Sequence, residues 1–137
     1  NVSLLSANAL DLPFAEDSFN AVIIAFGIRN IMNRASALHE FRRVLKPEGM
    51  LAVLELATPP PGFLRSLYLL YFQKILPGVG GIFSRNIRAY HYLPNSVLNF
   101  PRPAQFADLV RASGFAEVRW KSLTAGIATL YVGKKPL

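Results

Sequence analysis

An arginine and an asparagine stand side by side where a strongly apolar segment ends. The segment VIIAFGIRN, Val22 to Asn30, begins with five apolar residues and closes on Arg29 and Asn30. Arg29 supplies a permanent positive charge and cannot act as a base, whereas Asn30 can orient an oxygen or a water molecule. A buried strand has no need of a guanidinium at its end. This pair is therefore the first candidate for chemistry.

The elements around the pair place it at one edge of a sheet. Asn20 to Phe26 predicts a strand covered on both faces, RASALHEFRRVLKPEG predicts a helix ended by its proline and glycine, and Met50 to Leu56 predicts a second strand. Strand, helix and strand with short connections form the βαβ unit of a parallel sheet. Ligands of such sheets bind beyond the carboxyl ends of the strands, where Arg29, Asn30 and Glu55 lie. Glu55 suits a loop-bracing role as well as a site role, so we do not assign it.

The remaining segments predict further elements. Val2 to Leu5 predicts a short strand, FLRSLYLLYFQKILP a helix that is apolar nearly all round, and Ile87 to Phe100 a second helical stretch. RPAQFADLVRASG predicts an amphipathic helix, and Phe115 to Leu123 with Ile127 to Gly133 predicts an antiparallel pair at a sheet edge. The predicted fold class is α/β, an open and partly parallel sheet finished by an antiparallel hairpin.

Composition limits the kind of protein. The chain has 137 residues, of which 52% are hydrophobic and 17% are charged. This length and this hydrophobic fraction are typical of one ordered domain. It has no cysteine and only His39 and His91, which excludes a thiolate metal site and a histidine-rich metal cage. No uncharged apolar run reaches the roughly 20 residues of a membrane-spanning helix. The chain lacks an initial Met and a signal-peptide pattern, so we expect a piece of a longer, cytoplasmic protein.

Positive charge is concentrated in the second part of the chain. Residues 1–60 carry five Lys/Arg and six Asp/Glu, whereas residues 61–137 carry ten and two. The resulting net charges of −1 and +8 suggest an anionic partner for the second part, either a membrane surface or a nucleic acid. A solvated basic face that aids solubility is the alternative.

Four segments together carry a family resemblance. NALDLPFAEDSFNAVIIAFGIRN, RRVLKPEGMLAVLEL, AYHYLPNSV and LTAGIATLYVG resemble the ubiquinone/menaquinone-biosynthesis C-methyltransferases, which are S-adenosylmethionine-dependent enzymes with a Rossmann-like fold. The segments occur in the family's order and cover nearly all 137 residues. LPF…DSF and RVLKPxG indicate a methyltransferase in general, while FGIRN, YxYLPxS and LTAGI are more specific.

The resemblance also implies missing elements. The family's chain begins with helices, two strands, a glycine-rich loop and an acidic residue that hold the methionine and ribose parts of the cofactor, and none of these is in the sequence. GVGG at Gly78 to Gly81 follows a helix, so it does not replace that loop. Residues 1–137 therefore resemble the C-terminal part of a single methyltransferase domain. Alone, this part is expected to bind S-adenosylmethionine weakly or not at all and to be inactive.

The implied reaction attaches a methyl group to a ring carbon of a polyprenyl quinol. A phenol has a pKa near 10, so its ionisation at pH 7 costs about 4 kcal/mol, and a fixed guanidinium can offset much of that cost. Arg29 suits this catalytic role, and Asn30 can orient the oxygen or a water that removes the proton. In the structural alternative Arg29 only ties down a loop by binding backbone carbonyls.

Further site residues follow from the resemblance. Asn8, Ala9 and Ala25 are expected to bind the cofactor; Asn8 stands where many relatives have aspartate, but either side chain can accept a hydrogen bond from the adenine amino group. Tyr90 and Tyr92 are expected to line the pocket for the ring, with aromatic core packing as the alternative. His91 between them is not assigned a catalytic role.

The apolar segment Phe63 to Pro77 fits a polyprenyl tail. An apolar helix with the basic flanks Arg65 and Lys74 could serve as a pocket wall and as a dock at the membrane surface. The alternative is a helix buried between the sheet and a partner subunit. We expect a protein that is cytoplasmic, with contact to the membrane periphery.

Two other function classes stay open. One is a related methyltransferase that acts on another phenolic or lipophilic acceptor, and the other is a non-catalytic module, either a silent scaffold or a basic nucleic-acid binder. Against nucleic acid, the arginines are scattered and no recognised motif accompanies them.

The implied truncation has a structural consequence. Without the family's first strand, Ala21 to Phe26 becomes a long apolar edge. We expect the strand of a second copy, or a rearranged N-terminal segment, to cover this edge, so that the chain self-associates. A monomer with a bare edge would count against the fold assignment.

Overall fold

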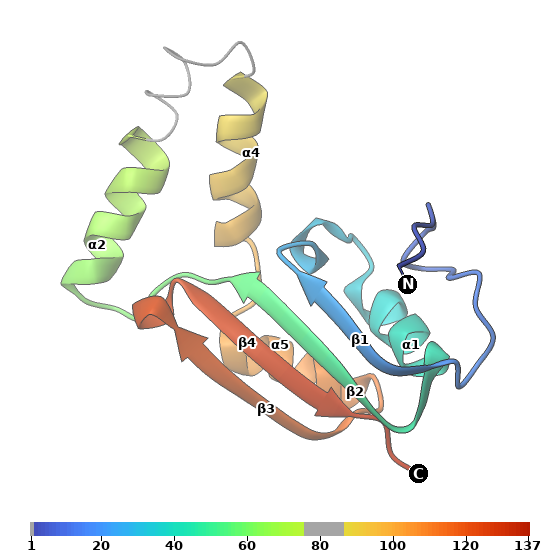
Figure 1. The fold of residues 1–137 in the computed structure, drawn as a ribbon. Helices are drawn as coiled ribbons and strands as arrows, with labels where there is room; N and C mark the ends of the chain where they lie inside the picture. The colour runs from blue at the N-terminus through green and yellow to red at the C-terminus, as the bar shows by residue number, and fades with distance from the viewer. Residues whose placement is uncertain (1, 76–86) are drawn as a thin grey trace.

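The computed structural model describes residues 2–75 and 87–137, without the side chains of residues 73, 74 and 87–91. The described elements, in chain order, are the strand β1 (Phe19–Ala25), the short helix η1 (Ile28–Asn30), α1 (Arg34–Val44), β2 (Leu45–Leu56), α2 (Phe63–Leu70), the π-helical turn η2 (Tyr71–Ile75), α4 (Ile87–Leu98), α5 (Pro103–Ala112), β3 (Ala116–Leu123), the turn η3 (Thr124–Gly126) and β4 (Ala128–Lys134). Figure 1 shows their arrangement.

A mixed sheet of the order β1-β2-β4-β3 forms the centre of the molecule. β1 and β2 are parallel, with Ile24 beside Val53, whereas β4 is antiparallel to both β2 and β3. The predicted βαβ unit and the closing hairpin are therefore confirmed. Because β1 and β2 are parallel, their carboxyl ends lie at the same edge of the sheet (Figure 1).

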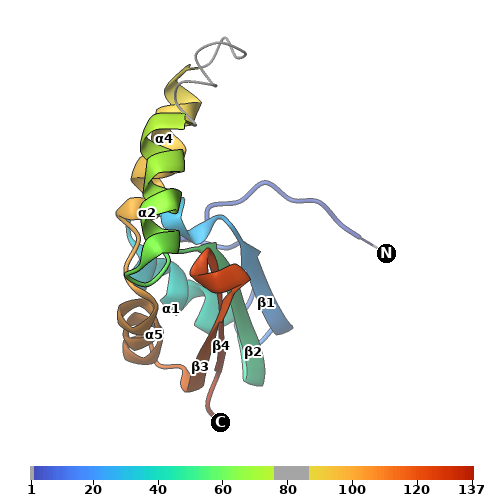
Figure 2. The same ribbon diagram turned by 90° about the vertical axis from the view of Figure 1, so that its left-hand side faces the viewer.

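The main core lies between the sheet and two helices, α1 and α5, which cover the same face (Figure 2). Leu38 and Phe41 of α1 and Phe106 of α5 are buried there against Val53 and Tyr131 of the sheet. The spacing of the apolar residues in both helices at three and four positions produces these faces. No described helix covers the opposite face, on which Ile23 is 76% exposed.

The helix α1 ends earlier than the sequence suggested. Pro47 and Gly49 were expected to end it, but its last residue is Val44 and Leu45 is already extended at ψ 139°. Leu45 pairs with Phe19 of β1, and the residue before a proline is itself biased toward extended backbone. Strand pairing and Pro47 therefore act together to stop the helix.

The prediction of a strand at Val2 to Leu5 is wrong for this chain. These residues form no strand, and a single bridge between Asn8 and Asp11 is the nearest pairing. A strand forms only against a neighbour, and the family's second strand, its expected neighbour, is not in the sequence.

The edge of β1 has no strand beside it among the described residues, so the N-terminal segment does not cover it as expected. The hydrogen bonds of that segment run to α1 instead, as described below. The strands β2, β4 and β3 and the two covering helices bury a core without such coverage. What a bare edge in a monomer would mean for the fold assignment stays a prediction. Coverage by a second copy stays a prediction.

The helices α2 and α4 rise together beyond the carboxyl ends of β1 and β2 (Figures 1 and 2). Tyr68 and Phe72 stack at 4.3 Å between ring centroids and pack with Val97 of α4 in a second, smaller core. The segment predicted as one helix, Phe63 to Pro77, is helical through Leu70 and continues as the π-helical turn to Ile75. None of the helices among the described residues is long and apolar enough to cross a membrane.

Candidate active site

The candidate site begins with a strained turn at the end of β1. Phe26 follows the strand and has a φ of +54°, a left-handed conformation that is rare for a bulky residue. Its N–H donates to the carbonyl of Leu54 at 2.8 Å, and its own carbonyl accepts from Nη1 of Arg29. Strain of this kind persists where the surroundings hold it and is concentrated at functional sites. The turn directs the chain into η1, where Arg29 and Asn30 lie.

Arg29 is paired with Glu55. The distance from Arg29 Nη1 to Glu55 Oε1 is 2.7 Å, and the backbone N–H of Arg29 donates to Glu55 Oε2 at 3.1 Å. The Glu55 side chain is 0% exposed and that of Arg29 is 11% exposed. A third donor, the N–H of Leu56, reaches Glu55 Oε1 at 2.9 Å. Glu55 therefore fixes the guanidinium, and the loop-tying alternative considered for Arg29 describes only part of its contacts.

Arg34 adds a second guanidinium beside Arg29. Its Nη2 donates to the carbonyl of Arg29 at 2.9 Å, and its guanidinium lies 5.3 Å from the centroid of the Phe100 ring. The Nε atoms of Arg29 and Arg34 are both buried without a hydrogen-bond partner. Buried donors are normally paired, so these two N–H groups leave hydrogen-bonding capacity unused within the protein.

A hollow of about 290 Å³ adjoins the two arginines. Within it, the hydroxyl of Tyr92 donates to Oδ1 of Asn30 at 2.7 Å, which fixes the amide and leaves its NH₂ group free of that bond. The hollow is lined by Arg29, Asn30, Ile31, Met32, Arg34, Tyr92, Asn95, Ser96 and Asn99. Its lining is cationic and rich in amides, which suits an anionic oxygen.

The predicted cofactor residues lie on the loop before β1 and at the end of that strand. Asn8 is exposed, and its Oδ1 accepts from the N–H of Leu10 at 3.0 Å, so it serves as a turn residue here. An amide oxygen has two lone pairs, so one is left for a ligand. Ala9 is half-buried against the main core, and Ala25 is exposed at the strand end.

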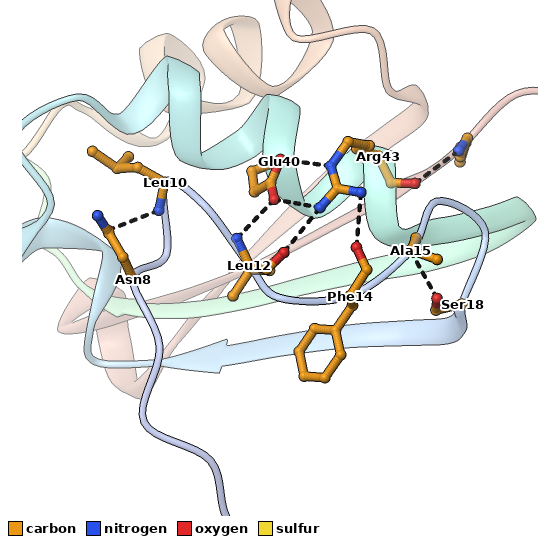
Figure 3. Close-up of polar contacts among 9 residues, drawn as sticks. Asn8, Leu10, Leu12, Phe14, Ala15, Ser18, Glu40 and Arg43 are labelled. Atoms are coloured by element: carbon orange, nitrogen blue, oxygen red, sulfur yellow. Dashed lines mark hydrogen bonds and ion pairs between the residues drawn. The ribbon is translucent and has the colours of Figure 1, made fainter.

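The loop that carries Asn8 is held against α1 (Figure 3). Glu40 Oε1 accepts from the N–H of Leu12 at 2.8 Å, while Arg43 donates to the carbonyls of Leu12 and Phe14 at 3.1 and 2.9 Å. The two side chains also pair at 2.6 Å, and this contact with Arg43 lowers the pKa of Glu40 below its ordinary value. This clamp explains why the N-terminal segment does not turn back over the β1 edge.

The structure brings together three of the predicted site residues, Arg29, Asn30 and Tyr92. The side chain of Tyr90 lies outside the described residues. Sequence reasoning left Glu55 unassigned and missed Arg34, because nothing in the spacing shows which charged residue of a helix start faces a neighbouring turn. Among the described residues, no cluster of His, Asp or Glu could hold a metal ion.

Comparison with known proteins decides the family. The model of the ubiE/COQ5 methyltransferase family matches residues 1–135. The chain belongs to the ubiE/COQ5 methyltransferase family. The resemblance given by FGIRN, YxYLPxS and LTAGI is thus confirmed.

Relatives in this family are close in sequence but longer. The chain is 46% identical over 134 residues to the ubiquinone/menaquinone biosynthesis C-methyltransferase UbiE of Geotalea daltonii, covering 98% of this chain and 57% of the relative. It is 47% identical over 135 residues to the demethylmenaquinone methyltransferase of Thermus thermophilus, covering 98% and 61%. The chain therefore spans roughly three fifths of the length of these relatives.

Solved structures support the fold class. An S-adenosylmethionine-dependent methyltransferase of Thermotoga maritima, described as a possible histamine N-methyltransferase, matches with a TM-score of 0.66 at 21% identity, over 98% of this chain and 64% of that one. A putative methyltransferase of Bacillus halodurans matches with a TM-score of 0.63 at 14% identity, over 99% and 78%. At these identities the likeness concerns the fold, which is the partial Rossmann-like methyltransferase sheet that the sequence predicted.

Proposed function

We propose that this chain, as the C-terminal part of a single methyltransferase domain, takes part in S-adenosylmethionine-dependent C-methylation of a polyprenyl quinol ring in menaquinone or ubiquinone biosynthesis. The names of its relatives in the family support the reaction class. The observation that carries the proposal is the pair of arginines, Arg29 and Arg34, that line a hollow at the carboxyl ends of two parallel strands.

The reaction needs a cation in the site because the ring carbon that is methylated is a weak nucleophile. A ring carbon of a quinol becomes nucleophilic when the adjacent hydroxyl loses its proton, which costs about 4 kcal/mol at pH 7 for a pKa near 10. Donors fixed in advance around the oxygen lower this cost because they need no reorganisation during the reaction. S-adenosylmethionine, when bound, supplies the electrophilic methyl group.

Arg29 and Arg34 have different electrostatic roles in this proposal. Glu55 balances the charge of Arg29 and holds it in place, so Arg29 acts on the phenolate through a directed N–H group more than through net charge. Arg34 has no carboxylate within 4.0 Å among the described residues, and therefore provides the net positive charge of the hollow. The NH₂ group of Asn30, fixed by Tyr92, donates to the same oxygen or to a water that removes the proton.

The residues of this chain fit only part of the cofactor. The second lone pair of the Asn8 amide can accept from the adenine amino group, and the small side chain of Ala25 leaves the strand end open. Ala9 supports this loop through its packing against the core. Because no described turn resembles a glycine-rich phosphate- or carboxylate-binding loop, the chain alone is expected to bind S-adenosylmethionine weakly and to be inactive.

Methyl transfer to a quinol tests the proposal in the longer protein that contains this chain. We expect transfer to a ring carbon of a chemically reduced, short-chain demethylmenaquinol, and a loss of roughly a hundredfold in kcat when Arg29→Met removes the donor. The matched control is Arg111→Met, an exposed arginine on α5 that pairs with Asp108 and donates to the carbonyl of Val118. Transfer to other phenols but not to a quinol would instead support the related methyltransferase, and normal turnover of the Arg29→Met variant would refute the mechanism.

We also propose that the isolated chain self-associates through β1. An edge strand presents unpaired N–H and C=O groups, and here its outward face carries the exposed Ile23 and Phe19. A dimer or larger assembly should therefore appear in sedimentation analysis and be lost with Ile23→Lys. A monomer at all concentrations would contradict this proposal.

A further inference from the structure

A second hollow, of about 430 Å³, lies at the base of α2, and it shares no lining residue with the hollow of the candidate active site. It is bounded by the starts of α2 and α5, by the end of β3 and by the turn η3. Its volume falls within the range of about 300–1,000 Å³ that is usual for small-molecule sites. The walls include the half-exposed ring of Trp120 and four prolines, Pro59, Pro60, Pro61 and Pro103. They are therefore largely apolar and rigid.

The charged side chains that line this hollow are two arginines without a carboxylate partner, Arg65 and Arg102. All eight Asp and Glu residues of the chain lie in the described part, and the ion pairs there involve other cations. Arg65 lies in the first turn of α2 and Arg102 is the N-cap of α5, and neither helix has an acidic residue in its first turn. Each guanidinium thus adds to the positive end of a helix. Two positive charges on one hollow favour a ligand that carries two negative charges.

The turn η3, which closes one side of the hollow, has an unusual backbone. It is formed by LTAGI, Leu123 to Ile127, a motif to which the proposed function gives no role. Thr124, Ala125 and Gly126 have φ values of +48°, +54° and +93°, and a left-handed φ is an outlier for a β-branched residue such as Thr124. Gly126 lines the hollow, and a Cβ there would lie 2.9 Å from Cδ of Pro60, so the turn touches the segment that leads into α2 (Figure 1). Backbone strain of this kind is concentrated at functional sites, which supports a ligand-binding role for the hollow.

We propose that this hollow binds a small soluble molecule in which a phosphate group is joined to a flat apolar ring. The phosphate pairs with Arg65 and Arg102, because a guanidinium forms strong bidentate hydrogen bonds to phosphate oxygens. The ring packs against the indole of Trp120 and the proline walls. The hydroxyls of Thr58 and Ser122, which also line the hollow, can bond to polar substituents of the ring. This site goes beyond the proposed methyl transfer and does not depend on it.

The lining matches both parts of such a ligand. An apolar molecule alone would leave the two guanidiniums without an anion, and a bare anion would leave the indole and the prolines without an apolar contact. A single strand of nucleic acid binds along a groove with a series of cations and aromatic rings, whereas here two cations and one aromatic ring line a single hollow. A small phosphate monoester with a ring is therefore the ligand that complements the whole lining.

Binding of phenyl phosphate to the 137-residue chain tests this site. Trp120 is the reporter, because it is the only tryptophan of the chain, and its fluorescence should change saturably as the compound is added. Two compounds separate the parts of the ligand: glycerol 3-phosphate is a phosphate monoester without the ring, and benzyl alcohol has the ring without the charge. Each should bind at least about tenfold more weakly than phenyl phosphate.

Matched variants separate direct contact from general charge. Arg65→Gln and Arg102→Gln should each weaken the binding of phenyl phosphate about tenfold. Arg119→Gln removes the same charge from the exposed residue before Trp120 on β3, whose side chain points to the opposite face of the strand, and should change binding little. Trp120→Leu, measured by isothermal titration calorimetry, should weaken the binding of phenyl phosphate but leave that of glycerol 3-phosphate unchanged. Circular dichroism of each variant shows whether it is folded.

Three results would overturn the proposal. They are the absence of saturable binding of phenyl phosphate by both methods, binding of glycerol 3-phosphate or benzyl alcohol as tight as that of phenyl phosphate, and a loss with Arg119→Gln equal to that with the other two arginine variants. Because the assay contains neither quinol nor S-adenosylmethionine, a negative result leaves the methyl-transfer proposal standing, and a failure of methyl transfer leaves this site standing.

Discussion

Replacing Glu55 by glutamine should expose how strongly the candidate site depends on its buried ion pair. The change keeps the size and an acceptor oxygen but removes the charge opposite Arg29. Glu55 is 0% exposed and Arg29 is 11% exposed, so the guanidinium would be left nearly buried and unbalanced. Removing one partner of such a pair costs about 3–5 kcal/mol. Since Arg29 lines an open hollow and keeps its bond to the Phe26 carbonyl, we expect the lower end, about 3 kcal/mol.

Urea unfolding of the 137-residue chain, followed by fluorescence of the single tryptophan, Trp120, measures this loss. The matched control is Asp108→Asn, which breaks the exposed pair with Arg111 and should cost less than about 0.5 kcal/mol. Combining Glu55→Gln with Arg29→Met removes both charges and should be less damaging than Glu55→Gln alone. A Glu55→Gln cost as small as that of Asp108→Asn, or strict additivity in the double variant, would refute the coupling of these two residues.

Three further predictions concern stability and order. Burial raises the pKa of Tyr131 to about 12 and so favours its neutral form in the folded state; stability should fall by about 2 kcal/mol as the pH rises from 10 to 12, and urea unfolding of Tyr131→Phe should show a smaller fall. Gly114 has a φ of +90°, and a Cβ there would lie 2.9 Å from Nε of Arg42, so Gly114→Ala should lower the melting temperature, with a cost of about 1–3 kcal/mol. Arg43→Met removes two bonds to the loop before β1, so amide exchange at Leu12 should become faster, while an unchanged rate would show that Glu40 alone holds the loop.

Local patterns predicted most of the fold because they are set by burial. Once a parallel sheet is assumed, the unbroken apolar run that ends at Phe26 predicts only a buried strand. The spacing of three and four that includes Leu38 and Phe41 likewise predicts only a helix with one buried face. The same reasoning gave a wrong prediction for the N-terminal segment. Whether Val2 to Leu5 forms a strand depends on a neighbouring strand, and the pattern of the segment itself does not show whether that neighbour is present. The early end of α1 depended likewise on the pairing of Leu45 with β1.

The candidate site could be predicted only in outline. The position of Arg29 and Asn30 followed from the rule that ligands bind at carboxyl ends of parallel strands. The partners of these residues could not be predicted, since Glu55 is 26 positions and Tyr92 62 positions away from the group it contacts. Spacing along the chain does not encode such contacts, which arise only when β2 lies beside β1 and α4 stands above the turn.

The most direct test of the central claim is the pH dependence of kcat for methyl transfer to a quinol, measured in the longer protein with and without Arg29→Met. If Arg29 stabilises the phenolate, the variant should be slowest near neutral pH and should recover as the pH approaches the phenol's own pKa of about 10. A deficit that is constant across this range, or no deficit at all, would show that Arg29 has a structural role and does not act on the ionised oxygen.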